Sequence, residues 1–154
     1  ERILSKMQNV EREKLATIKL LIGYCKRMSN LVISNYNEET YNKEKINLLI
    51  NELFQDASSF NISGILINND INECSSEIIL KIYDSIFAVI ENINNTNIIV
   101  SIVQNNGYTE IIINVEKNTK NLSKELIKKC EECILDVEEK KTEEGTKISY
   151  KINS

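Results

Sequence analysis

The chain contains no histidine among its 154 residues. Imidazole is the side chain that most readily gains or loses a proton near neutral pH, and it is also a common metal ligand. Its absence excludes, within this chain, histidine-based acid–base catalysis, histidine metal ligands and a phosphoaccepting histidine. Triads of the serine–histidine type are excluded for the same reason, and no phosphate-binding P-loop motif is present.

Proline is absent, and glycine and cysteine occur four times each. The four cysteines suggest no disulfide framework, and a domain of this length needs none, which favours a reducing, cytoplasmic setting. Cys130 and Cys133 form a C-x-x-C motif in a helical pattern, but neither a second such motif nor a histidine accompanies it. We interpret both residues as half-buried helix thiols and predict no metal site.

Long apolar runs and an excess of basic residues are missing as well. No apolar run approaches the roughly 20 residues that span a bilayer, and the net charge is -4 with both signs mixed along the chain. We therefore expect no nucleic-acid partner and no membrane contact by this segment. The chain begins at Glu1 rather than Met, which leaves room for an upstream membrane-bound sensor.

Residues 2 to 34 have the apolar spacing of one long helix, about 50 Å in length at about 1.5 Å per residue. A narrow apolar seam on a helix longer than a small domain needs is typical of a coiled coil or helical hairpin. We predict a homodimer formed through this helix; the alternative is an amphipathic helix packed on its own domain. The candidate interface residues are Met7, Val10, Ile18, Leu21, Cys25 and Met28.

The rest of the sequence alternates between helical and strand patterns after a polar, turn-like stretch at 34–42. Helices are predicted at about 43–60, from Ser75 or Ser76 to Ile93, and at 121–136. Strands are predicted at 62–67, 97–104, 109–116 and 148–152, with a tight hairpin at Asn106-Gly107. This order predicts an α/β (α+β) two-layer sandwich, with a mixed sheet, helices on one face and the long N-terminal helix standing apart as an arm.

Several stretches in this order resemble the ATP-binding catalytic domain of sensor histidine kinases, which has the Bergerat (GHKL) fold. "SSEIILKIYDSIFAVIENI" resembles the helix that carries the N-box, and "NIIVSIVQNNGYTEIIINVEKN" resembles the hairpin that leads into the G1 box. "EEGTKISYKI" resembles the closing turn and strand. The resemblance implies an ATPase-like domain at 43–154, preceded at 1–37 by part of the helical dimerisation and phosphotransfer region.

The N-box of that family has a glutamate and, four residues later, an asparagine that helps to hold Mg²⁺. Asn92 occupies the asparagine position, but Ala88 stands where the glutamate is expected. Glu91 is the nearest carboxylate in sequence, and one helical step turns it by about 100° away from that position. The resemblance therefore implies a nucleotide site with no catalytic residue, although Asn92 and Glu91 remain candidate nucleotide-binding residues.

The G1 box of the family reads Asp-x-Gly-x-Gly, and its aspartate accepts a hydrogen bond from the adenine amino group. Lys117 stands in place of that aspartate and cannot accept a hydrogen bond, and Thr119 replaces the first glycine. The segment that forms the family's ATP lid is missing. Lys117 and Asn118 are the candidate site residues here, either in a solvated loop or in a weak anion site at a helix start.

Three hypotheses follow for the function. The first is a pseudokinase module with a degraded ATP site that acts by dimerisation and by docking a response regulator or another partner, without a cofactor. The second is an active histidine kinase fragment that binds ATP and Mg²⁺ in a divergent site. The third is an α/β interaction domain with a coiled-coil arm, unrelated to kinases.

Overall fold

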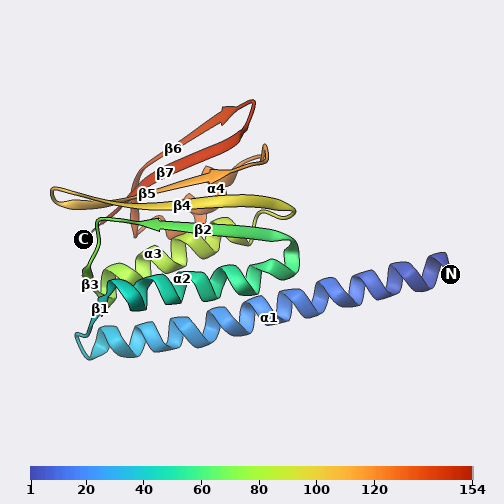
Figure 1. Cartoon of the computed structure of the whole chain (residues 1–154), viewed down its shortest axis with the longest axis horizontal. Helices are drawn as coiled ribbons and strands as arrows, with labels where there is room; N and C mark the ends of the chain where they lie inside the picture. The colour runs from blue at the N-terminus through green and yellow to red at the C-terminus, as the bar shows by residue number, and fades with distance from the viewer. Residues whose placement is uncertain (154) are drawn as a thin grey trace.

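The computed structural model describes residues 1–153, and its centre is one mixed five-stranded sheet (Figure 1). Strands β2 and β4 are parallel, and the other neighbours in the order β2-β4-β5-β7-β6 are antiparallel. The predicted hairpin joins β4 to β5, with Gly107 at a φ of 88°. The strands are β2 (Ile62–Asn68), β4 (Thr96–Asn105), β5 (Tyr108–Val115), β6 (Ile134–Thr142) and β7 (Gly145–Ile152).

Three helices cover one face of this sheet, as Figure 1 shows, in agreement with the predicted two-layer sandwich. They are α2 (Lys43–Ala57), α3 (Ser76–Ile90) and α4 (Leu122–Cys130). Side chains cap the first two: the Asn42 side chain accepts a hydrogen bond from the Lys45 N–H, and the Ser75 hydroxyl accepts one from the Ile78 N–H. Helix α2 is shorter than predicted, because residues 58–60 form a 3₁₀ turn (η1).

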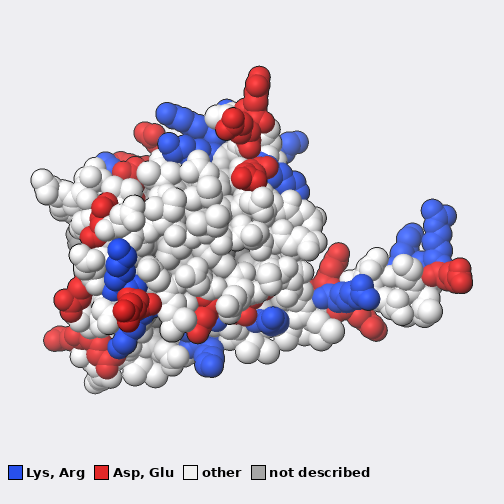
Figure 2. All heavy atoms as spheres, viewed as in Figure 1, with Lys and Arg blue, Asp and Glu red and all other residues white. Residues whose placement is uncertain are grey.

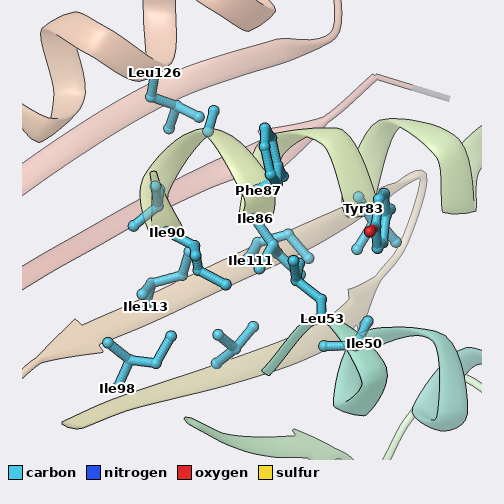
Figure 3. Close-up of a cluster of buried hydrophobic side chains, with 14 of the residues drawn as sticks. Ile50, Leu53, Tyr83, Ile86, Phe87, Ile90, Ile98, Ile111, Ile113 and Leu126 are labelled. Atoms are coloured by element: carbon cyan, nitrogen blue, oxygen red, sulfur yellow. The ribbon is translucent and has the colours of Figure 1, made fainter. Parts of the chain in front are cut away.

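Helix α3 forms the middle of the hydrophobic core. Ten of its fifteen residues are buried, because its apolar side chains project both toward the sheet and away from it. Figure 3 shows Ile86 and Ile90 of α3 between the strand residues Ile111 and Ile113 and the helix residue Leu126. A helix that is apolar on nearly all sides has to be covered on nearly all sides, and α1 supplies the remaining cover.

Helix α1 (Arg2–Tyr36) packs against both α2 and α3 along its C-terminal half. Residues 2–15 are exposed throughout and extend beyond the domain, whereas residues 16–36 form a third layer on the other helices (Figure 1). The prediction of one long helix is confirmed, but the expectation that it stands apart as an arm is wrong for this half. The buried residues of α1 are Ala16, Leu20, Arg27, Leu31 and Ser34.

The structure contains two short strands that the sequence analysis does not predict. One lies in the predicted polar turn, and the other lies just before α3. Strand β1 (Thr40–Asn42) pairs antiparallel with β3 (Glu73–Ser75) and so joins the starts of α2 and α3. The Thr40 hydroxyl also donates to the Glu73 carboxylate at 2.8 Å. Strands of three residues are too short to show an alternating pattern, so they cannot be recognised from the sequence.

The predicted helix at 121–136 is wrong beyond Cys130, because residues 134–142 form the edge strand β6. Most of β6 is charged and exposed, so its sequence lacks the apolar alternation that predicts a strand. A bulge between Leu135 and Glu138 interrupts its pairing with β7, and Asp136 there has a φ of 51°. Pairing with β7, rather than local preference, makes this segment a strand.

We expect Leu53→Ala to lower the free energy of unfolding by about 2–5 kcal/mol, because the substitution leaves a cavity in the core. Leu53 is fully buried, whereas Leu48 on the same helix is 61% exposed. Leu48→Ala is the matched control and should change stability by less than about 0.5 kcal/mol. Urea unfolding followed by circular dichroism measures both. Equal losses would contradict the placement of α2 against the sheet.

Candidate functional site

The candidate residues Glu91, Asn92, Lys117 and Asn118 lie around the C-terminal end of α3, in two segments that β4 and β5 bring together. Helix α3 ends at Ile90, so Glu91 and Asn92 directly follow it. Residues 116–121 connect β5 to α4. These two segments are linked by Lys117, whose ammonium group donates to the side-chain oxygen of Asn94 at 3.2 Å and to its backbone carbonyl at 3.4 Å. The structure thus gathers all four candidates in one region of the fold.

Asn92 binds the end of its own helix. Its side-chain amide donates to the backbone carbonyl of Ala88 at 2.7 Å, which satisfies one of the carbonyls left free where α3 ends. Ala88 itself is 2% exposed and belongs to the core. A glutamate at position 88 would therefore place a carboxylate in an apolar environment at a high energetic cost.

Glu91 forms an ion pair with Lys129 in the last turn of α4. The side chains of Glu91 and Lys129 are 25% and 41% exposed, so the pair lies in the partly buried junction between the two helices. In this position Glu91 links α3 to α4. To serve as a metal ligand or as a base, its carboxylate would first have to leave Lys129.

The loop at 116–121 is held by the turn between β6 and β7. The Thr146 hydroxyl donates to the backbone carbonyl of Lys117 at 3.2 Å and accepts a hydrogen bond from the Thr119 N–H at 3.1 Å. When its amide nitrogen faces the carbonyls, Asn118 donates to the backbone oxygens of Thr142 at 3.3 Å and of Gly145 at 3.1 Å. The loop, for which the sequence predicts either a solvated segment or a weak anion site, is mostly exposed but makes specific contacts on its inner side.

Gly145 allows this close approach. It has a φ of 143°, and a Cβ atom built there would lie 2.0 Å from the carbonyl oxygen of Val115. Only glycine fits both the backbone conformation and the space. The loop that follows Val115 runs directly into α4 at Leu122, without an intervening lid segment. The Gly-Thr pair at 145–146 thus serves, in this chain, to fasten a short loop to the sheet.

No group of three or more histidine, cysteine, aspartate or glutamate side chains within residues 1–153 is arranged to hold a metal ion. The C-x-x-C thiols are free: Cys130 is buried at the end of α4, and Cys133 is half-buried just beyond it. Burial is the main reason that the pKa of Cys130 is raised to about 12, so its thiol stays protonated at neutral pH.

Within the same described range, residues 1–153, no helix is long and apolar enough to cross a membrane.

The candidate dimer residues on α1 separate into two groups. Met7, Val10, Ile18 and Leu21 are between 45% and 58% exposed, and Cys25 is also exposed. Met28 is different because it packs against the hydrophobic core of its own chain. Leu21 also lines a small cavity of about 170 Å³ between α1 and α3. Residues 2–15, which are exposed throughout, therefore carry the apolar side chains of α1 that do not contact the domain.

A buried polar network that the sequence did not reveal joins α1 to the domain. The Arg27 guanidinium donates to the Tyr83 hydroxyl at 2.6 Å and to the Asp56 carboxylate at 2.5 Å, and Glu52 lies 3.9 Å from it. Burial alone lowers the pKa of Arg27, but the bonds to Asp56 and Tyr83 raise it above its ordinary value. Nearby, the Tyr24 hydroxyl donates to Asp84 at 2.6 Å. The partners are 29 to 60 residues apart, so no local pattern could have shown them.

No protein-family model and no curated protein matches this sequence. Solved structures do match it. The nucleotide-free catalytic domain of the histidine kinase ThkA aligns with a TM-score of 0.54 at 10% identity, over 75% of this chain and 96% of that one. The histidine kinase domain of the Erythrobacter litoralis EL346 blue-light activated histidine kinase aligns with a TM-score of 0.53 at 9% identity, over 82% of this chain and 78% of that one. At such identities the likeness shows the fold alone.

We expect Arg27→Ala to lower the free energy of unfolding by about 3 kcal/mol or more. The substitution leaves the Asp56 carboxylate and the Tyr83 hydroxyl without their partner, in a partly buried site between α1 and the domain. Urea unfolding measures the loss. The neighbouring Lys26 is exposed, and Lys26→Ala is the matched control with an expected change below about 0.5 kcal/mol. If Arg27→Ala leaves the free energy of unfolding unchanged, apolar contacts alone hold α1 on the domain.

Proposed function

The chain has the fold of the catalytic domains of histidine kinases, and from that premise we propose that it is a pseudokinase module of two-component signalling. In this proposal it has lost nucleotide chemistry and acts by dimerisation and by docking a protein partner. The observation that carries the proposal is the state of the loop at 116–121, which is short, without a lid, and hydrogen-bonded to the β6–β7 turn.

The chemistry of phosphoryl transfer supports this reading. Transfer from ATP requires a divalent cation that neutralises the phosphates, and groups that hold and align the nucleotide. Asn92 is the one residue of a metal-binding pair that is present, and its amide is already used by Ala88. Glu91 is paired with Lys129, and Lys117 brings a positive charge to the place where an acceptor for adenine is expected. Each of these groups contributes to the fold instead.

A second candidate function is an active kinase fragment that binds Mg²⁺ and ATP in a divergent way. The fold favours it, as does the presence of Asn92 beside a loop that contains Lys117 and Asn118. Binding would require these three side chains to exchange their present partners for the nucleotide. The third hypothesis was an α/β interaction domain with a coiled-coil arm, unrelated to kinases. The likeness in fold to histidine kinase catalytic domains, which covers most of the chain, weighs against it.

The proposed partners follow from the exposed helix and from the fold. Residues 2–15 of α1 present unpartnered apolar side chains, including Ile3, Leu4, Met7 and Val10. Pairing of two such helices would remove this surface from water. A response regulator is the partner class that the fold suggests for docking. The four free cysteines fit a module that works in the reducing cytoplasm.

We expect no saturable heat when Mg·ATP or Mg·ADP is titrated calorimetrically into the full chain up to millimolar nucleotide, because the loop leaves no prepared contacts for adenine or phosphate. A nucleotide-binding histidine kinase domain under the same conditions is the positive control. Saturable binding that disappears in a folded Asn92→Ala variant would overturn the proposal and favour the kinase fragment.

We expect Val10→Lys to weaken association through α1, because it places a charge in the centre of the exposed apolar seam, where the helix extends beyond its own domain. Light scattering coupled to size exclusion should show a smaller mass than that of the unmodified chain. Asn9→Lys adds the same charge one residue earlier, outside the seam, and is the matched control. An unchanged mass for Val10→Lys would exclude dimerisation through this helix.

A further inference from the structure

The two edges of the five-stranded sheet differ in how they are protected. Strand β6 forms one edge, and it is bulged and carries five charged residues in nine positions, namely Asp136, Glu138, Glu139, Lys140 and Lys141. Charges and bulges of this kind prevent an edge strand from pairing with another chain. This edge of the sheet is therefore closed to further strands.

Strand β2 forms the other edge and has none of these protections. Its sequence, "ISGILIN", contains no charged residue and no proline, and its pairing with β4 is regular over all seven residues. Within residues 1–153 no strand pairs with its outer side. Half of its backbone N–H and C=O groups consequently point away from the sheet, and such an edge is a template for another strand.

The surroundings of β2 are also free of charge. A groove of about 720 Å³ runs between the edge strand and α2, and none of its lining residues is charged: Asn51, Phe54, Gln55, Ser58, Asn61, Ile62, Ser63 and Gly64. Figure 2 shows a surface without charged side chains over the part of the molecule where Figure 1 draws β4 and most of β2, while charged side chains appear over the region of α2. On the open face of the sheet, Ile65 and Ile67 of β2 are 59% and 42% exposed.

We propose that β2 is a self-association edge, on which β2 of a second copy of this chain adds antiparallel, with Ile65 on the twofold axis. This register pairs the whole strand with itself. Ile65 lies opposite Ile65 of the second copy, and Gly64 lies opposite the second copy's Leu66. The two five-stranded sheets become one continuous sheet, and the outward-pointing backbone groups of both edges are satisfied.

Shape supports this register. Gly64 has no side chain, and the Phe54 ring packs so closely under it that a Cβ atom would lie 2.5 Å from the ring. Leu66, two residues along, points to the same face of the sheet and is half-buried. In the antiparallel pair the second copy's Leu66 lies opposite Gly64 on this face, beside the groove that Phe54 and Gly64 line, and no side chain at position 64 stands in its way. The same contact occurs twice, once on each side of the axis.

Charge favours a second copy over an unrelated strand. A twofold interface brings identical surfaces together, so any charged residue near the axis would meet its own like charge. The edge strand and its groove lack charges of either sign, which is the condition that self-pairing requires. An unrelated partner imposes no such condition, since its charges could complement those of the edge.

Sedimentation equilibrium of the full chain tests this interface. Every sample carries Val10→Lys, so that pairing through α1 does not contribute to the measured mass. We expect the Val10→Lys chain to have twice the 17.7 kDa mass of one chain. Adding Ile65→Lys or Ile65→Glu should reduce it to the mass of one chain, because like charges then face each other on the axis. Adding Ile127→Lys, at a site on α4 that is as exposed as Ile67, should leave the dimer intact.

An equimolar mixture of the Ile65→Lys and Ile65→Glu variants should restore the dimer, because residue 65 meets residue 65 in this register and the charges become opposite. The proposal is overturned if the Val10→Lys chain is monomeric, if either substitution at Ile65 leaves the dimer unchanged, or if the mixture stays monomeric. None of these results bears on nucleotide binding or on α1, so this interface and the proposed function fail separately.

Discussion

Helix α3 is packed between the sheet and α1, and its burial on nearly every side is the constraint to which the other elements respond. The sheet covers one side of α3 through Ile111 and Ile113, and α4 covers another through Leu126. Helix α1 covers the rest, where the Tyr24 ring stacks on Phe87 with 3.9 Å between ring centroids, and the Arg27–Tyr83 bond adds a buried polar contact. Half of the long N-terminal helix therefore belongs to the domain, because without it α3 would expose apolar surface to water.

The same packing determines what the candidate site can do. The end of α3 lies against α4, and the ion pair between Glu91 and Lys129 closes that junction. The loop before α4 lies against the β6–β7 turn, where Thr146 satisfies its backbone. Polar groups at positions that could serve a nucleotide are thus paired with other groups of the protein. Releasing them would expose unpaired donors and acceptors at a free-energy cost that nucleotide binding would have to exceed.

Two surfaces with exposed apolar side chains remain without a partner inside the described chain, and they lie on different elements. One is the N-terminal part of α1, which extends past the domain, and the other is the uncharged edge at β2. Exposed apolar surface of this kind is typical of protein–protein interfaces. A chain that forms contacts at both surfaces would assemble beyond a dimer.

Local pattern in the sequence determined the long first helix, the buried helix from Ser75 onward and the hairpin at Asn106-Gly107. These features depend on residues within a few positions of one another, whose spacing shows directly in the chain. Only the tertiary structure decided that a charged segment becomes the edge strand β6 and that Arg27 is buried against Tyr83 and Asp56. It also decided that Glu91 is committed to Lys129. Arg27 and Glu91 depend on partners far away in sequence, and β6 depends on its pairing with β7. In each case the packing of the layers, rather than any preference of the residues themselves, decides the outcome.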